Sequence, residues 1–385
     1  MELLIFDNLK NDRGIKGFIE KNTAAYLRGV INFAETESVT QNSGREYIVS
    51  LIANDENILS SLAAQGKNTG SGLYNAALKD IEYIFEEIIP VFSGIEYTSS
   101  GNATGFCDEY LHSISSLAGI KEPSAFLDKL IEHYKKFGTG IKAKYTAFKY
   151  DGNGISGISD VDFADFDSLV GLEHQKKILI NNTKAFTQGK KANNVLLFGD
   201  RGTGKSSSVK ALLTMFRGDG LRIVELEKSQ ICNMRALIDE LSLSPHKYII
   251  FLDDLAFESG DPDYLALKVS MEGQLRAAPD NVLVYATSNR RHLIKETWAD
   301  REGGEIHKND QRQSTMSLSE RFGISLVFTS PNQREYLTIV SELLKKHSIE
   351  MTPEIERQAL IWEMNYSGFS GRCAKQFVSS VLHEK

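Results

Sequence analysis

Gly199-Asp200-Arg201-Gly202-Thr203-Gly204-Lys205-Ser206 directly follows the apolar run Asn194-Val195-Leu196-Leu197-Phe198. This stretch fits the pattern G-x-x-x-x-G-K-[ST], in which a strand leads through a glycine-rich turn into a helix. Backbone N–H groups of such a turn and the positive end of the helix dipole converge on one point. The glycines let a phosphate approach the backbone closely. The stretch therefore predicts a phosphate-binding loop at the start of a helix.

The residue types at the end of this loop indicate how a nucleotide would be held. Lys205 is predicted to bridge the β- and γ-phosphates, and the Ser206 hydroxyl is predicted to ligate Mg²⁺. We expect Ser207 and the rest of the loop to contribute further contacts. A loop that is rich in glycine by chance does not explain Lys-Ser at the required positions. The sequence therefore predicts binding of a nucleoside triphosphate.

Length and composition are those of an ordinary globular protein. The chain has 385 residues, which is enough for two or three domains, and 41% of them are apolar. It has no run of about 18 apolar residues, so no membrane span is expected. Its start, Met1-Glu2-Leu3-Leu4-Ile5-Phe6-Asp7, lacks the basic residues and long apolar centre of a secretory signal. The three cysteines lie far apart and form no metal-binding or disulfide pattern, which is typical of a cytoplasmic protein.

The charge balance argues against a protein that binds nucleic acid mainly by electrostatics. The net charge is −7 and the pI is near 5.7. Two small basic groups remain as candidate partner or phosphate contacts, although a solvated face is the usual role of such groups. These groups are Arg290 with Arg291, and Lys142 with Lys144 and Lys149.

The first part of the chain, residues 1–150, has a helical pattern and no chemical motif. Apolar residues recur every three or four positions over 74–88, which predicts an amphipathic helix closed by Pro90. A second helix is predicted from Pro123 to a stop at Gly138. We interpret this part as a helical packing or partner-binding domain. Residues 151–165, which begin with a stretch rich in glycine, serine and aspartate, are predicted to be a linker.

The remainder alternates strands and helices and then becomes helical. Strands are predicted at 195–198, 221–226, 248–252, 282–287 and 324–328, which indicates a doubly wound parallel sheet over residues 166–329. Residues 330–385 are predicted to form a lid of three helices. The first is expected to be capped by Ser330, with Pro331 in its first turn and Gln333 at the third helical position. The fold class expected is therefore α/β, with helical domains on either side along the chain.

Polar residues follow the predicted strands where a nucleotide site would need them. The strand at 248–252 ends in Asp253 and Asp254, although such an ending alone is also typical of a strand that meets a turn. We expect Asp253 to bind Mg²⁺ directly or through water, and Asp254 to act as the base that polarises the attacking water. Asn289 follows the next strand and is expected to orient that water. Arg321 and Arg372 are expected to stabilise phosphoryl charge, although an internal salt bridge and a capping role are their respective alternatives.

In this order the motifs resemble the Walker A, Walker B, sensor 1, arginine finger and sensor 2 elements of the AAA+ ATPases. Within that superfamily, the segments 253–258, 287–294 and 318–323 are similar to the bacterial ATPases grouped as domain-of-unknown-function family 815. The resemblance covers about residues 163–385. It implies a P-loop core with a helical lid, ATP and Mg²⁺ as ligands, and contacts of Val170 and Gly171 with adenine. It also implies a homo-oligomer in which Arg321 serves the neighbouring subunit.

One departure from the superfamily concerns the catalytic acid. Many AAA+ proteins carry glutamate where this chain has Asp254, and an acid one methylene shorter predicts slow turnover. Three hypotheses therefore remain: a slow ATPase that remodels or recruits a macromolecular partner, a nucleotide-gated binding module without turnover, and a DNA-remodelling initiator or helicase loader. The polar loop over residues 298–316 is expected to face a neighbouring subunit or a substrate.

Overall fold

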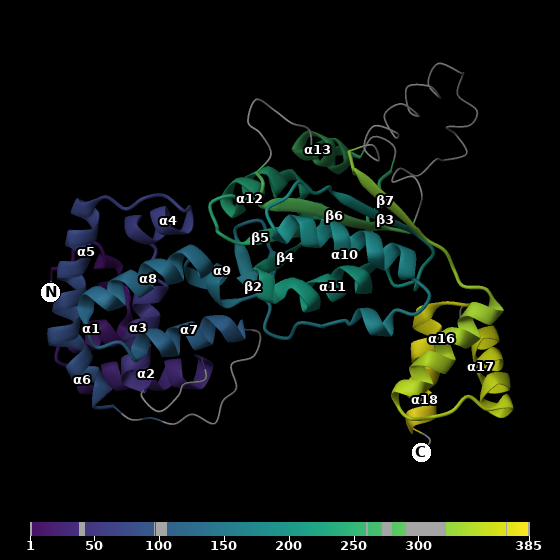
Figure 1. The fold of residues 1–385 in the computed structure, drawn as a ribbon, viewed down its shortest axis with the longest axis horizontal. Helices are drawn as coiled ribbons and strands as arrows, with labels where there is room; N and C mark the ends of the chain where they lie inside the picture. The colour runs from purple at the N-terminus through teal and green to yellow at the C-terminus, as the bar shows by residue number, and fades with distance from the viewer. Residues whose placement is uncertain are drawn as a thin grey trace. The chain divides into compact units, whose positions relative to one another are not determined.

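The computed structural model describes residues 2–37, 43–95, 97, 106–258, 261–271, 279–289, 321–366 and 368–383 (Figure 1). The chain divides into two compact units. The first consists of Met1–Phe148, Ser156–Val161 and Asp239–His246, and the second of Lys149–Ile155, Asp162–Ile238 and Lys247–Lys385. Each unit is described by itself below. No described helix combines the length and the apolar character that crossing a membrane would require.

The first unit is mainly helical and has its own hydrophobic core. Its helices are α1 (Arg13–Ile19), α2 (Thr23–Glu37), α3 (Ser43–Ala53), α4 (Ile58–Ala64), α5 (Ser71–Tyr83), α6 (Ile89–Ser93), α7 (Asp108–Ala118), α8 (Pro123–Phe137) and α9 (Gly140–Lys144). Fully buried aromatic side chains from several helices fill the core, including Phe92, Tyr110, Phe126 and Tyr134. Helix α8 runs as predicted and ends at Gly138, which adopts a φ of 71° that favours glycine.

The helix predicted to close at Pro90 continues past this residue. A π-helical turn, Ile84–Ile88, follows α5, and α6 then runs to Ser93. Pro90 lies in the first turn of α6, where a helix needs no backbone donor and the fixed φ of proline fits. The prediction of a stop was therefore wrong because the helix restarts in a new register at the proline.

The second unit is built on a parallel sheet, and the strand that leads into the glycine-rich loop lies between two other strands, one position from the sheet edge. The strands of this unit are β3 (Val195–Gly199), β4 (Leu221–Leu226), β5 (Lys247–Leu252), β6 (Val282–Ser288) and β7 (Ile324–Phe328). Two further strands of the sheet, β1 (Ala147–Tyr150) and β2 (Ile155–Gly157), have residues in both units. Their order in the sheet is β2-β1-β4-β5-β6-β3-β7, and the pairs from β4 to β7 are parallel. The carboxyl ends of β3, β5 and β6 therefore meet at one edge, which is where such sheets bind ligands.

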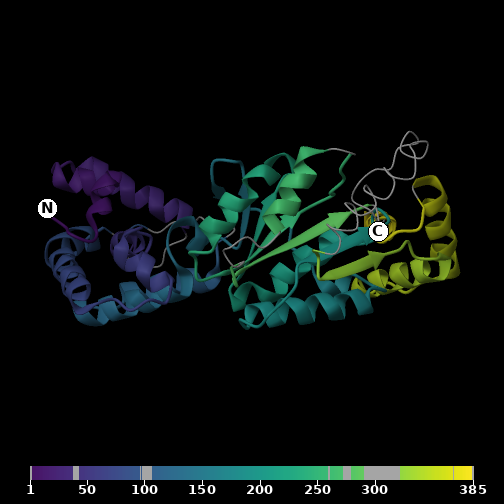
Figure 2. The same ribbon diagram turned by 90° about the horizontal axis from the view of Figure 1, so that it is seen from above.

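Helices cover both faces of this sheet. Helices α10 (Glu173–Thr187) and α11 (Lys205–Phe216) lie on one face, and α13 (Pro262–Met271) lies on the other (Figures 1 and 2). The inner strands are accordingly buried almost throughout, as in β5, where every residue after Lys247 is buried. The five strand regions predicted from sequence agree with β3 to β7 within one residue at each end.

Three helices form the end of the chain: α16 (Gln333–Lys346), α17 (Pro353–Tyr366) and α18 (Gly371–His383). They enclose a small core that includes Tyr336, Leu344 and Phe377. The expected cap at Ser330 was wrong, because Asn332 caps α16 and forms a reciprocal capping box with Glu335. The predicted α/β class is confirmed: a mainly parallel sheet with helices follows a mainly helical N-terminal part and precedes three C-terminal helices, which we call the lid. The stretch 151–165, predicted to be a linker, contains β2.

One titratable side chain is deeply buried in the helical unit. His133 on α8 is 3% exposed, and its Nδ1 lies 2.9 Å from the Ser113 hydroxyl. The rings of Tyr110 and Phe137 pack around it at centroid distances of 5.6 and 5.0 Å. Burial lowers the pKa of His133 to about 4, and the charge of nearby Lys136 acts in the same direction. The imidazole is therefore neutral in the folded protein at neutral pH.

This buried histidine makes stability depend on pH. In the unfolded chain a histidine has a pKa near 6.5. Between about pH 6.5 and pH 4 the unfolded state therefore binds a proton at His133, whereas the folded state does not. We expect the free energy of unfolding to fall as the pH drops from about 6.5 to about 4, by up to about 3 kcal/mol from this residue. Urea unfolding at pH 7 and pH 4.5 measures the change, and His133→Phe should reduce it. Equal pH dependence in both proteins would contradict the assignment.

Candidate nucleotide-binding site

The glycine-rich loop connects β3 to α11 and depends on its glycines. Gly199, Gly202 and Gly204 have φ values of 131°, 73° and 98°, a region that other residues rarely adopt. A Cβ on Gly199 would lie 2.0 Å from the backbone oxygen of Phe328 on the neighbouring strand. A Cβ on Gly204 would lie 3.2 Å from the Leu172 side chain. The loop therefore needs glycine both for its backbone angles and for its close neighbours.

Lys205 at the first position of α11 is almost fully buried and bonds to three acceptors. Its Nζ donates to the carbonyl oxygens of Gly199 at 2.9 Å and Asp200 at 2.6 Å, and to Oδ1 of Asn289 at 3.0 Å. Burial lowers the pKa of the Lys205 ammonium, while the charges of Asp254, Asp200 and Asp253 oppose this effect. The structure thus brings the loop lysine into direct contact with the asparagine at the end of β6.

The expected metal-binding pair also comes together. The Ser206 hydroxyl donates to Oδ1 of Asp253 at 2.7 Å, and the Thr287 hydroxyl donates to the same oxygen. Within the described part of the chain no cluster of three or more His, Cys, Asp or Glu side chains could hold a metal. A hydroxyl and one carboxylate fit Mg²⁺, which is usually held by one or two carboxylates together with substrate phosphates and water. Ser206 and Asp253 would therefore hold the ion if a nucleotide supplied the other ligands.

Asp254 has a strained backbone and is held from β6. Its φ is 52°, in the left-handed region that non-glycine residues rarely adopt. Its backbone N–H donates to the Thr287 hydroxyl at 2.8 Å, and its carboxylate accepts a hydrogen bond from the Asn289 amide. Because Asn289 also contacts Lys205, the proposed catalytic acid and the loop lysine are linked through one side chain. Backbone strain of this kind is common at functional sites.

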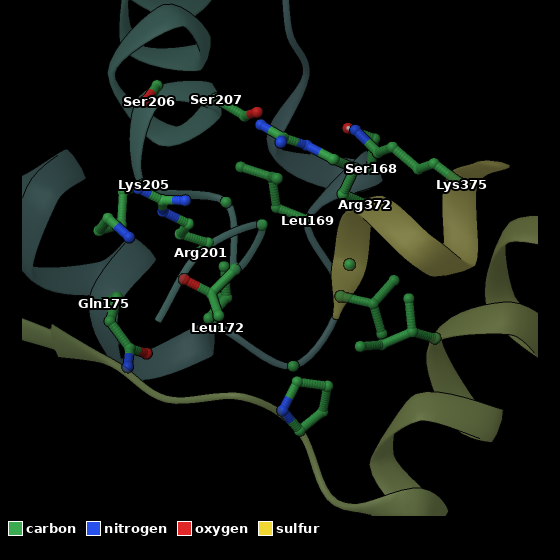
Figure 3. Close-up of a pocket in the computed structure, with 18 of the residues that line it drawn as sticks. Ser168, Leu169, Leu172, Gln175, Arg201, Lys205, Ser206, Ser207, Arg372 and Lys375 are labelled. Carbon is green, nitrogen blue, oxygen red and sulfur yellow. Dashed lines mark hydrogen bonds between the residues drawn. The ribbon is translucent and has the colours of Figure 1, made fainter. Parts of the chain in front are cut away.

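A cleft of about 770 Å³ is lined by the glycine-rich loop, by the polar residues that follow β5 and β6, and by residues of the lid (Figure 3). This volume is in the range of small-molecule sites. Its lining includes most of the residues predicted to bind nucleotide or metal, namely Val170, Gly171, Arg201, Gly202, Thr203, Gly204, Lys205, Ser206, Ser207, Asp253, Asp254, Asn289 and Arg372. Gly199 and Asp200 do not line it, and instead bind Lys205 through their carbonyl oxygens.

The lid contacts the loop directly through the start of α18. The backbone N–H of Arg372 donates to the carbonyl oxygen of Gly202 at 3.1 Å. The Arg372 and Lys375 side chains extend from α18 into the cleft, and Nζ of Lys375 lies 3.3 Å from the Ser168 hydroxyl (Figure 3). Burial lowers the pKa of Lys375. Sequence reasoning missed Lys375, although its position three residues after Arg372 places both on one face of a helix.

Asp200 makes a second connection between the loop and the lid. Its Oδ2 accepts a hydrogen bond of 2.7 Å from the backbone N–H of Ser330, in the segment that leads from β7 to α16. This bond is the main cause of a lowered pKa for the Asp200 carboxyl. The second residue of the phosphate-loop motif therefore holds the segment that enters the lid.

Arg321 is not brought into the cleft of its own chain. It is exposed and lies just before β7, and it is absent from the described lining residues. Arg290, Arg291 and the loop 298–316 lie outside the described residues.

The lysines considered as a basic patch are in ion pairs. Lys142 pairs with Glu240 at 2.7 Å, Lys149 pairs with Glu227 at 2.7 Å, and Lys144 pairs with Glu37. Each ammonium group therefore faces a carboxylate, and a nucleic-acid phosphate would have to compete with that partner. These three residues therefore do not form a free positive surface.

Comparisons with solved structures found partial similarities. The Holliday junction branch migration motor RuvB of Thermotoga maritima is 17% identical, with 57% of this chain and 64% of RuvB covered and a TM-score of 0.37. Trip13 from the Escherichia coli MS115-1 complex with HORMA and CdnC is 14% identical, with coverage of 56% and 89% and a TM-score of 0.36. Aeropyrum pernix Orc1 in complex with DNA is 16% identical, with coverage of 56% and 60% and a TM-score of 0.38. The chain thus spans less than two thirds of the RuvB length.

Comparison with protein families found a match over the C-terminal part of the chain. The family model described as "Protein of unknown function (DUF815)" matches residues 143–385, well over half of the chain. No curated protein matches the chain. The resemblance that the motifs predict is therefore confirmed, and the chain belongs to the DUF815 family.

Proposed function

We propose that this protein binds ATP with Mg²⁺, hydrolyses it slowly, and uses the nucleotide state to remodel or recruit a macromolecular partner. One observation carries the proposal. A single cleft is lined by the phosphate loop, by the acids after β5, by Asn289 after β6 and by Arg372 of the lid. Backbone donors, a lysine, a hydroxyl and a carboxylate at such a cleft are the groups that phosphoryl transfer requires.

In this proposal each side chain has a distinct task. Lys205 would exchange its loop carbonyls for the β- and γ-phosphate oxygens, and Asp254 would orient the attacking water and accept its proton. Asn289 and Arg372 would stabilise charge that develops on the γ-phosphate. Bound Mg²⁺ would supply neutralisation of the phosphate oxygens, held by Ser206 and, directly or through water, by Asp253.

Two features of Asp254 support slow turnover. Aspartate is one methylene shorter than the glutamate that many AAA+ proteins carry, and here its carboxylate is engaged by the Asn289 amide. The same features are also consistent with the alternative function, a nucleotide-gated binding module without turnover. A DNA-remodelling role is less well supported, because the net charge is −7 and Lys142, Lys144 and Lys149 are paired with glutamates. Because the three cysteines are all free, we place this activity in the cytoplasm.

Nucleotide binding and turnover are separable by two substitutions. Lys205→Ala should weaken ATP binding at least about tenfold, because it removes the cation that faces the phosphates. Asp254→Asn should retain ATP binding and lower the rate of phosphate release about a hundredfold or more, because an amide cannot accept the proton. Fluorescence titration with a labelled ATP analogue and single-turnover phosphate release provide the two measurements.

Lys210→Ala is the matched control for these variants. Lys210 lies on the same helix, but its Nζ pairs with Asp162 at 2.7 Å and it does not line the cleft. This variant should behave as wild type. ATP binding that survives Lys205→Ala unchanged would refute the proposed site. Binding without any phosphate release in the wild type would favour the gated binding module.

We further propose a homo-oligomer in which Arg321 completes the site of the neighbouring subunit. The position of Arg321 outside its own cleft supports this role. Mixing an inactive Arg321→Ala protein with an inactive Lys205→Ala protein should restore measurable ATPase activity, because some interfaces then combine an intact loop with an intact arginine. Arg357→Ala, which removes a surface pair with Glu354 at 3.0 Å, is the control and should stay active alone. Mixtures that remain inactive at every ratio would rule out this arrangement.

A further inference from the structure

Thr287 connects β6, on which it lies, to the two aspartates that follow β5. The residue is 1% exposed. Its hydroxyl donates to Oδ1 of Asp253 and accepts the backbone N–H of Asp254 at 2.8 Å. Its backbone oxygen accepts the N–H of Leu255 at 2.7 Å. One threonine therefore contacts three successive residues of the turn after β5.

The bond to Asp253 restricts the orientation of this carboxylate. Oδ1 of Asp253 accepts from two hydroxyls, that of Ser206 and that of Thr287. Two donors on one oxygen limit rotation of the carboxylate about its side-chain bond. Partners of this kind commonly orient the groups that hold a metal, and their loss typically reduces metal affinity or activity 10- to 100-fold.

The bond to Asp254 supports an unfavourable backbone conformation. At a φ of 52°, Asp254 adopts an angle that persists in folded proteins only where the surroundings impose it. The Thr287 hydroxyl accepts the N–H of this residue, and the adjacent Leu255 is held on both sides, by the Thr287 oxygen and by the Ser288 hydroxyl at 2.7 Å. The end of β6 thus holds the turn in which Asp254 lies.

We propose that Thr287 is a positioning residue that sets the orientation of both aspartates, Asp253 toward the metal and Asp254 toward the attacking water. The inference rests on the proposed function of this site. Threonine suits the role because one hydroxyl can donate to a carboxylate and accept from an N–H at the same time. Its β-branch also limits side-chain rotation, which keeps the hydroxyl in place.

Two variants separate the hydroxyl from the packing of the side chain. Thr287→Val keeps the shape and removes the hydroxyl, whereas Thr287→Ser keeps the hydroxyl and removes a methyl group. For Thr287→Val we expect the gain in ATP affinity on adding Mg²⁺, relative to EDTA, to shrink at least about tenfold, and kcat to fall 10- to 100-fold. ATP affinity in EDTA should stay within about threefold, because the phosphate loop is unchanged. Thr287→Ser should stay within about threefold of wild type in all three quantities.

ATP affinity in EDTA also shows whether each variant keeps a folded cleft. If Thr287→Val loses that affinity, Thr287→Cys takes its place, since a thiol is a weak donor of similar size, and the same loss of the Mg²⁺ effect is expected. Equal losses in the valine and serine variants would assign the effect to packing and overturn the inference. If Thr287→Val behaves as wild type, the inference about Thr287 is wrong, but the proposed function of the site still stands. A wild-type protein that neither binds nor hydrolyses ATP would refute the proposed function as well.

Discussion

The buried ammonium group of Lys205 is the interaction on which the site depends. A charge removed from water is costly unless it is fully hydrogen-bonded, and here it bonds to two loop carbonyls and to Asn289. These acceptors come from the end of β3, from the loop and from the residue after β6. Asn289 in turn donates to Asp254, which lies after β5. The carboxyl ends of three strands are therefore joined into one hydrogen-bonded unit around a single cation.

The same loop carries the attachment of the lid. Gly202 accepts the N–H of Arg372 at the start of α18, and Asp200 accepts the N–H of Ser330 before α16. Gly202 lines the cleft together with Lys205 and Ser206. We therefore expect a change in loop conformation on phosphate binding to reach the lid at two points. Packed elements joined in this way respond to small shifts as units rather than by gradual deformation.

Local sequence patterns predicted the strands and the glycine-rich loop well, because in each a single type of residue determines the backbone conformation. The strand regions from β3 to β7 follow from apolar runs that end in glycine or polar residues, and the glycines of the loop meet the positive φ angles that such a turn requires. Prediction failed where two local signals competed. Pro90 lies within a continuing helix because a π-helical turn precedes it. Asn332 rather than Ser330 caps α16, because Glu335 completes its capping box.

The sequence by itself determined which chemical groups are available and in what order they occur, since the loop motif and the acid-tipped strand are each contained in a few adjacent residues. Only the tertiary structure decided which groups meet. Lys205 and Asn289 are 84 residues apart, and Asp253 and Thr287 are 34 apart, yet each pair is hydrogen-bonded. These contacts arise because β6 lies between β5 and β3 in the sheet. Strand order depends on long-range packing, which no local pattern encodes, so the contacts of Thr287 with the two aspartates became visible only in three dimensions.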